Sequence, residues 1–128
     1  MSKDWVQDIR EFLVAMGGVA GHIESRPVEP PTEVMMLRYQ LIQEEGSETL
    51  KALREKDLVD LADGICDTIV VLIGTALAYG IDLQPIWDEI HRTNMLKTTG
   101  SIRADGKRLK PVDWKPPKVR ELLLEQLK

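Results

Sequence analysis

The chain has 128 residues, which is enough for one domain with a hydrophobic core. Because 43% of the residues are hydrophobic and 30% are charged, disorder is excluded as the main state, and the net charge of -4 provides no basic surface for nucleic acid. The single cysteine, Cys66, excludes an intramolecular disulfide and favours a reducing, cytoplasmic location. The acidic first turns argue against a signal peptide, and the longest apolar run, residues 68–80, is too short to cross a membrane.

Helical periodicity predicts an all-α fold that forms a single domain over residues 1–128. Residues 4–16 place apolar side chains at helical spacing, and two glycines follow them. Residues 21–31 contain three prolines and no periodicity, which predicts a loop. Thr32 is the expected N-cap of the next helix.

The second predicted helix, residues 33–55, has two apolar arcs. The expected core face consists of Met35, Tyr39, Ile42, Gly46, Leu50 and Leu53. The other arc contains Val34, Leu37, Leu41 and Ala52, together with Glu44, Glu45 and Glu48. On a helical projection Glu48 lies between Leu37 and Leu41. Because burial of an unpaired carboxylate is costly, we expect Glu48 to have a cation or a hydrogen-bonding partner.

The third predicted helix, residues 58–79, places its acids on one face. Its expected core face consists of Leu58, Ala62, Ile65, Ile69, Leu72, Ile73 and Ala76. Asp60, Asp63 and Asp67 lie opposite, where ordinary amphipathicity would also place polar residues. Aspartate is a poor former of helix interiors, however, so three of them at this spacing favour a function.

The last third of the chain is basic. A fourth helix is predicted over residues 83–96, an Asp-Gly turn or small hairpin within residues 101–110, and a short helix over residues 119–127. Five basic residues fall between Arg103 and Lys115. We therefore expect an antiparallel four-helix bundle-like core with a short C-terminal helix and a basic irregular tail.

This segregation of charge indicates phosphate chemistry. If the basic tail folds over the acidic helices, the carboxylates can hold Mg²⁺ and the cations can bind phosphate oxygens. A glutamate that is not fully engaged with metal can take a proton from water. The two histidines lack the ligand spacing of a zinc site.

Two acidic segments carry a family resemblance. They are Glu44-Glu45-Gly-Ser-Glu48 and Asp60-Leu-Ala-Asp63-Gly-Ile-Cys-Asp67. They resemble the all-α NTP pyrophosphohydrolases, the superfamily of MazG, dimeric dUTPases and phosphoribosyl-ATP pyrophosphohydrolase. That family has an ExxE motif on one helix and an ExxD motif on the next. Here the second pair has aspartate in place of glutamate. The resemblance continues through residues 91–97 and 105–111, as in the phosphoribosyl-ATP-pyrophosphohydrolase-like branch.

The resemblance implies hydrolysis of a nucleoside triphosphate between its α- and β-phosphates, with Mg²⁺ as cofactor and Mn²⁺ as a substitute. The implied metal ligands are Glu45, Glu48, Asp60, Asp63 and Asp67. The implied catalytic residues are Glu44 and Glu45, with Glu44 as a general base or a further ligand. The implied substrate-binding residues are Arg38, Asn94, Lys97, Lys110 and Trp114. From the residues alone, Asn94 and Lys97 are also compatible with a helix C-terminal cap, and Trp114 with core packing.

The assembly and two other functions stay open at this stage. The family's site is built at a subunit interface, which implies a homodimer that could pair again into a tetramer. A di-iron carboxylate bundle is less compatible, because it needs two Glu-x-x-His pairs and only Asp88-x-x-His91 approximates one. The other alternative is a non-catalytic helical dimer that binds a protein partner. Base selectivity is expected to come from residues 21–31 and Trp114.

Overall fold

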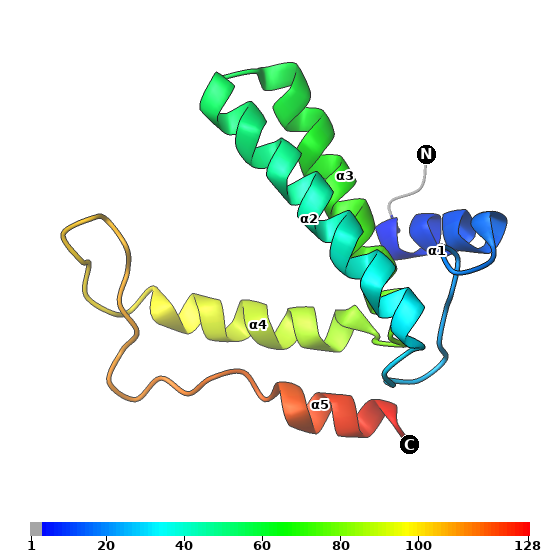
Figure 1. Ribbon diagram of the computed structural model, residues 1–128. Coiled ribbons are helices and arrows are strands. Elements are labelled where there is room, and N and C mark those ends of the chain that lie inside the picture. Colours follow the sequence, from blue (N-terminus) through cyan, green and yellow to red (C-terminus); the bar gives the residue numbers. More distant parts are fainter. Residues whose placement is uncertain (1–3) are drawn as a thin grey trace. The chain divides into compact units, whose positions relative to one another are not determined.

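The computed structural model describes residues 4–128, which form five α-helices and no strand (Figure 1). The helices are α1 (Trp5–Met16), α2 (Thr32–Glu55), α3 (Leu58–Ala78), α4 (Leu83–Lys97) and α5 (Val119–Gln126). The all-α prediction is confirmed, and the helix bounds agree with the predicted ones to within one residue at each end. The chain separates into two compact units, one ending at Ile81 and the other running from Asp82 to Lys128. A single domain with a four-helix bundle-like core stays a prediction.

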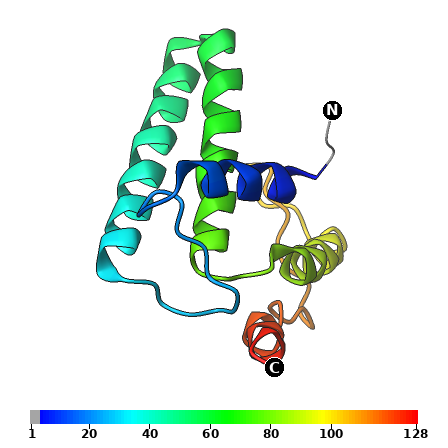
Figure 2. The same ribbon diagram turned by 90° about the vertical axis from the view of Figure 1, so that its right-hand side faces the viewer.

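A tight hairpin joins α2 and α3, which lie side by side and run in opposite directions (Figures 1 and 2). Lys56 reverses the chain in a left-handed conformation with φ of 56°. Asp57 then caps α3 by accepting a hydrogen bond of 3.0 Å from the backbone N–H of Asp60. At the other end of the hairpin, the N-cap of α2 is Pro31 and Thr32 is already helical, so the predicted Thr32 cap is wrong.

Small and hydroxylated residues form the contact between α2 and α3. A Cβ atom added to Gly64 would lie 3.2 Å from the Cα atom of Thr49, and one added to Gly74 would lie 2.6 Å from Nη2 of Arg38. The hydroxyl groups of Thr49 and Thr68 share a hydrogen bond of 3.0 Å. The absence of a side chain at Gly64 lets the two backbones approach closely, and its absence at Gly74 leaves room for the guanidinium of Arg38.

The predicted core stripes of these two helices are therefore wrong for this chain on its own. The stripe residues that remain exposed are Met35, Tyr39, Leu50 and Leu53 on α2 and Leu58, Ile65 and Leu72 on α3. The residues buried instead are Val34, Arg38 and Ala52 on α2 and Gly64, Val71 and Gly74 on α3. Of the predicted α3 stripe, Ile73 and Ala76 are buried. The closest packing thus follows the small residues rather than the largest aliphatic ones.

Within residues 4–128, α3 is the one helix long and apolar enough, by length and composition, to cross a membrane. A core helix that packs against its neighbours meets the same criteria, and α3 packs against both α1 and α2.

The loop between α1 and α2 is anchored to the C-terminal end of α3. The backbone N–H of Glu24 donates to the carbonyl of Leu77 at 3.0 Å, and that of Val28 donates to the carbonyl of Tyr79 at 3.1 Å. Gly80 has φ of +68°, and a Cβ atom added there would overlap the backbone carbonyl of Arg26. The loop predicted over residues 21–31 is confirmed, and it holds α1 across α3 (Figure 2).

In the second unit, α4 and α5 are joined at two points. The side-chain amide of Gln126 accepts from the backbone N–H of Asp82 and donates to its carbonyl, both at 2.9 Å. Glu89 accepts from the guanidinium of Arg92 and from the backbone N–H of Lys118 at the start of α5. These two donors lower the pKa of Glu89 to about 2.

Two alanine substitutions test the contact between the loop and Gly80. Gly18 also has a positive φ, of +61°, but nothing lies within 4 Å of its added Cβ atom. Gly18→Ala should therefore lower the free energy of unfolding only by the left-handed backbone penalty, about 1–2 kcal/mol. Gly80→Ala should lower it by about 1–3 kcal/mol more, because the loop must also move. Urea unfolding at one protein concentration measures both values, and equal losses would contradict the contact.

Candidate active site

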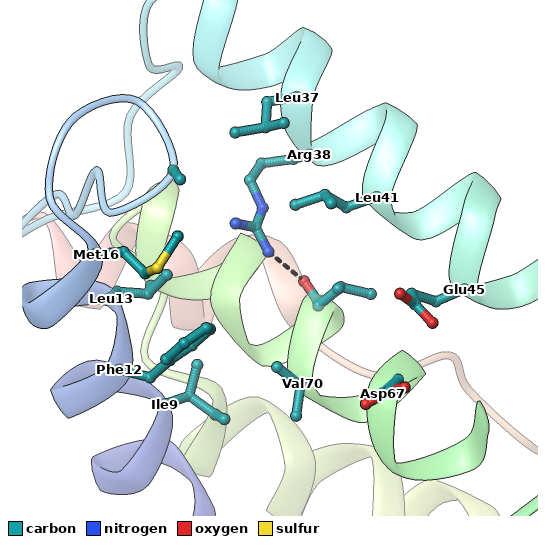
Figure 3. A pocket seen from close by; sticks show the side chains of 12 residues that line it. Ile9, Phe12, Leu13, Met16, Leu37, Arg38, Leu41, Glu45, Asp67 and Val70 are labelled. Atoms are coloured by element: carbon teal, nitrogen blue, oxygen red, sulfur yellow. Dashed lines mark hydrogen bonds between the residues drawn. The ribbon is translucent and has the colours of Figure 1, made fainter. Parts of the chain in front are cut away.

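A pocket of about 310 Å³ lies between α1, α2 and α3, entirely within the first unit (Figure 3). Nine of its twelve lining residues are apolar, and the other three are Arg38, Glu45 and Asp67. Two acids and one base thus face a space whose walls are otherwise hydrocarbon. Such a combination is typical of small-molecule sites.

Glu45 is the unusual group of this pocket. Its Oε2 atom is buried and has no hydrogen-bond partner within the described part of the chain. Desolvation raises the pKa of Glu45, and the negative charges of Glu48, Asp67 and Glu44 raise it further. A half-buried carboxylate among three others is destabilising when charged, and either a proton or a bound cation would relieve the repulsion.

The remaining predicted acids lie around Glu45 at different levels of the hairpin. Thr49 contacts Gly64 and Thr68, so Glu45 and Glu48 lie level with the middle of α3. Asp67 is half-buried beside Glu45, and Figure 3 shows their carboxylates close to each other at one end of the pocket.

The other four predicted acids, Glu44, Glu48, Asp60 and Asp63, are exposed. Their positions correct one expectation. Glu48 is solvated, and Glu45 is the acid held between the helices, because the arc of α2 that meets α3 is centred nearer to Glu45. Asp60 lies four residues, about 6 Å along the helix axis, closer to the hairpin turn than Gly64. It therefore lies farther from Glu45 than Asp67 does.

The acid set fits a hard divalent cation by chemistry. Carboxylate oxygens are the ligands that Mg²⁺ prefers, and the partnerless Oε2 of Glu45 is such a donor. Among residues 4–128, however, no three acidic, histidine or cysteine side chains converge closely enough to hold a metal ion. The five predicted ligands therefore stay a prediction, of which Glu45, Glu48 and Asp67 have the best support.

Arg38 lies in the same interface as Glu45, two helical turns earlier on α2. Its side chain is 5% exposed. Its Nε donates to the hydroxyl of Thr75 at 3.1 Å, and its Nη2 donates to the carbonyl of Val71 at 2.9 Å. Neither acceptor is charged, and Arg38 has no ion pair in the described residues. Desolvation by burial lowers the pKa of Arg38. Its predicted contact with substrate stays a prediction.

The predicted substrate residues of the second unit gather at the C-terminal end of α4. Nζ of Lys97 lies 5.1 Å, and that of Lys110 4.4 Å, from the centroid of the Trp114 ring. The indole N–H of Trp114 donates to the carbonyl of Thr93 at 2.8 Å, which attaches the tail to α4. Asn94 is exposed nearby on α4. A packing role for Trp114 is thus observed, whereas the phosphate contacts stay predictions.

The basic tail contains the predicted turn. Ile102 and Arg108 form an isolated antiparallel bridge, and Gly106 between them has φ of +89°. Sequence reasoning did not assign α1 to the site. Its stripe of Ile9, Phe12 and Met16 was visible as an amphipathic pattern, but that pattern alone indicates only a buried face.

The charge of Glu45 should make stability depend on pH. Because its pKa is raised in the folded chain, its neutral form stabilises the fold below the ordinary value of 4.5, and this stabilisation is lost as pH rises through the folded pKa. Glu45→Gln should therefore melt at a higher temperature than the parent near pH 7 in EDTA, and the difference should vanish at acidic pH.

Glu11→Gln is the matched control for this experiment, because it removes the same charge from an exposed position on α1. The difference in melting temperature between Glu11→Gln and the parent should vary much less with pH. Thermal melts between about pH 4 and pH 8 cover the range in which a raised glutamate pKa falls. A Glu45→Gln variant that is less stable than its parent near pH 7 would contradict the burial of this charge.

Comparison with known proteins places these residues in a family. The family model described as phosphoribosyl-ATP pyrophosphohydrolase matches residues 18–94, more than half of the chain. A search of curated proteins found no match. The matched range contains the whole of α2 and α3, and so all six predicted acids, whereas α1 precedes it. The resemblance inferred from the two acidic segments is confirmed, and the chain belongs to the phosphoribosyl-ATP pyrophosphohydrolase family, within the MazG-like NTP pyrophosphohydrolase superfamily.

Proposed function

We propose that this protein is a Mg²⁺-dependent nucleoside triphosphate pyrophosphohydrolase that releases a nucleoside monophosphate and pyrophosphate. Family membership supports pyrophosphohydrolase activity on a nucleotide-like substrate. The observation that carries the proposal is the half-buried carboxylate of Glu45, which lines the pocket beside Asp67 and whose Oε2 atom is buried without a partner among the described residues. A bound cation would stabilise such a group, and a cation at a pocket is a means of binding phosphates.

The proposed roles divide between neighbouring acids. Glu45, Glu48 and Asp67 would hold Mg²⁺, or Mn²⁺ in its place, with Asp60 and Asp63 as outer members of the set. When bound, the metal neutralises charge on the phosphate oxygens and acidifies water. Glu44 is exposed, and the side-chain amide of Gln40 donates to its Oε1 at 2.9 Å, which orients the carboxylate. We assign Glu44 the role of general base, which takes the proton of the attacking water while the α–β phosphoanhydride bond breaks.

We also propose that the protein works as a homodimer, which could pair again into a tetramer. The aliphatic stripes of α2 and α3 face away from their mutual contact, and only 33% of the most apolar stretch of α3 is buried. A surface of this kind on adjacent helices is typical of a helix–helix interface between subunits. A cytoplasmic location, with neither membrane nor nucleic acid as a partner, is part of the same proposal.

Pyrophosphate release tests the activity directly. A panel of NTPs, dNTPs and phosphoribosyl-ATP should contain at least one nucleotide from which the protein releases pyrophosphate with Mg²⁺ and none with EDTA. Glu44→Gln should lower kcat by about a hundredfold or more, the usual contribution of a general base. Glu11→Gln, at an exposed position of α1 that does not line the pocket, should keep the activity of the parent. The proposal fails if no nucleotide yields pyrophosphate, or if Glu44→Gln and Glu11→Gln are equally active.

Sedimentation tests the assembly. Ile65 is 45% exposed on the unpartnered face of α3. Ile65→Lys should therefore dissociate the dimer without unfolding the hairpin, because an unpaired charge in an apolar interface is strongly unfavourable. A lysine at Val14, which is 70% exposed on α1 and does not line the pocket, is the control and should leave the mass unchanged. A monomeric parent, or a dimeric Ile65→Lys variant, would overturn this part of the proposal.

A further inference from the structure

The wall of the pocket opposite α2 comes from a helix that the family match does not include. Ile9, Phe12 and Met16 of α1 face Leu37 and Leu41 of α2 across the pocket (Figure 3). α1 ends at Met16, two residues before the match begins. Phe12 is 51% exposed and Met16 is 55% exposed, so this apolar wall is only half covered by the chain itself.

The pocket has opposite charges at its two ends. Arg38 lies at one end, and Glu45 and Asp67 lie at the other (Figure 3). Seven residues separate Arg38 from Glu45 along α2, which corresponds to about 10.5 Å. The two charges do not neutralise each other, because neither has an ion pair in the described part of the chain.

The guanidinium of Arg38 retains donor capacity toward this space. Its Nε and Nη2 atoms have acceptors in α3, whereas its Nη1 atom has none among residues 4–128. Among residues 4–128, Glu45 Oε2 is the one fully buried side-chain N or O atom without a partner, so Nη1 keeps some accessible surface, and Arg38 is one of the residues that line the pocket. A guanidinium can only donate hydrogen bonds, so the group that it selects must be an acceptor.

We infer that this pocket binds the base of the substrate nucleotide, with a carbonyl edge toward Arg38, a ring face against Phe12, and the phosphates toward Glu45 and Asp67. The inference rests on the proposed function and extends it to the substrate class. A flat heterocycle suits a narrow apolar space with an aromatic wall, and a base carbonyl supplies the acceptor that Nη1 lacks. At the ring position where uracil, thymine and guanine carry a carbonyl, cytosine and adenine carry an amino group. The N–H groups of that amino group are donors and cannot accept a hydrogen bond from Arg38.

Calorimetric titration with nucleoside monophosphates tests the carbonyl preference, because these products bind without turnover. In buffer with Mg²⁺, UMP should bind about tenfold to a hundredfold more tightly than CMP, and GMP more tightly than AMP, the usual effect of a hydrogen bond to a charged group. Arg38→Gln has an amide that can accept as well as donate, so it should bring both ratios toward one, with a thermal melt to check its fold. Equal affinities for UMP and CMP in the parent protein, or no binding of any monophosphate, would overturn the inference.

Substitutions in α1 test the apolar wall separately. Phe12→Ala should weaken UMP binding about tenfold, as the loss of a stacking ring does elsewhere. Phe12→Leu keeps an apolar side chain without the ring, so its affinity for UMP should lie between those of Phe12→Ala and the parent. Val14→Ala changes α1 outside the pocket and should bind as the parent does. Circular dichroism checks that each variant remains helical. If Phe12→Ala binds UMP as tightly as Val14→Ala does, α1 is not part of the binding site.

The two proposals fail in different ways. If UMP binds in the expected pattern but no triphosphate yields pyrophosphate, the base pocket stands and the proposed hydrolysis fails. If pyrophosphate is released with a KM that Phe12→Ala does not change and with no preference for carbonyl bases, the hydrolysis stands and the base pocket fails.

Discussion

The close approach of α2 to α3 is the constraint on which the rest of the first unit depends. It is possible because α3 has glycine where α2 presents Thr49 and Arg38. Two backbones at this distance leave no room for leucine or isoleucine between them, so the largest aliphatic side chains turn outward. The same contact carries Arg38 and Glu45 into the interior. The burial of charge and the exposure of the aliphatic stripes therefore have one cause.

This packing leaves a cation and an anion in one interface without pairing them. Buried charges in proteins are ordinarily neutralised by each other or by hydrogen bonds. Arg38 has only a carbonyl and a hydroxyl as acceptors, and one oxygen of Glu45 has no partner among the described residues. The two positions lie two turns apart on one helix, which keeps the charges separate. An interface with a cation and an anion held apart suits a ligand with two unlike ends.

Helical periodicity predicted the helices of this chain closely but could not decide which arc of each helix faces its neighbour. α2 has two apolar arcs and α3 has an apolar face opposite its aspartates, and hydrophobicity ranks the aliphatic stripes first as the core. The observed contact depends instead on the size of single side chains, as at Gly64 and Gly74, and on pairs such as Thr49 and Thr68, which are distant in sequence. For the same reason Glu45, and not Glu48, is the half-buried acid with one buried oxygen. The role of α1 was missed because an amphipathic stripe does not distinguish a wall that remains half open from a core.

α1 lies outside the residues that match the family, whereas α2 and α3 lie inside them. The acids that support hydrolysis lie on α2 and α3, inside the match, whereas the apolar wall lies outside it. The family is named for a substrate derived from ATP, whose base has an amino group where uracil and guanine have a carbonyl. Cleavage of the phosphoanhydride bond requires only the phosphates and the acids, so it does not depend on whether the base carries an amino group or a carbonyl. A chain that keeps the acidic hairpin can therefore change its base by changing the residues that line the pocket beside the acids. In this protein those residues lie on both sides of the family boundary, with Arg38 on α2 inside the match and Phe12 on α1 outside it.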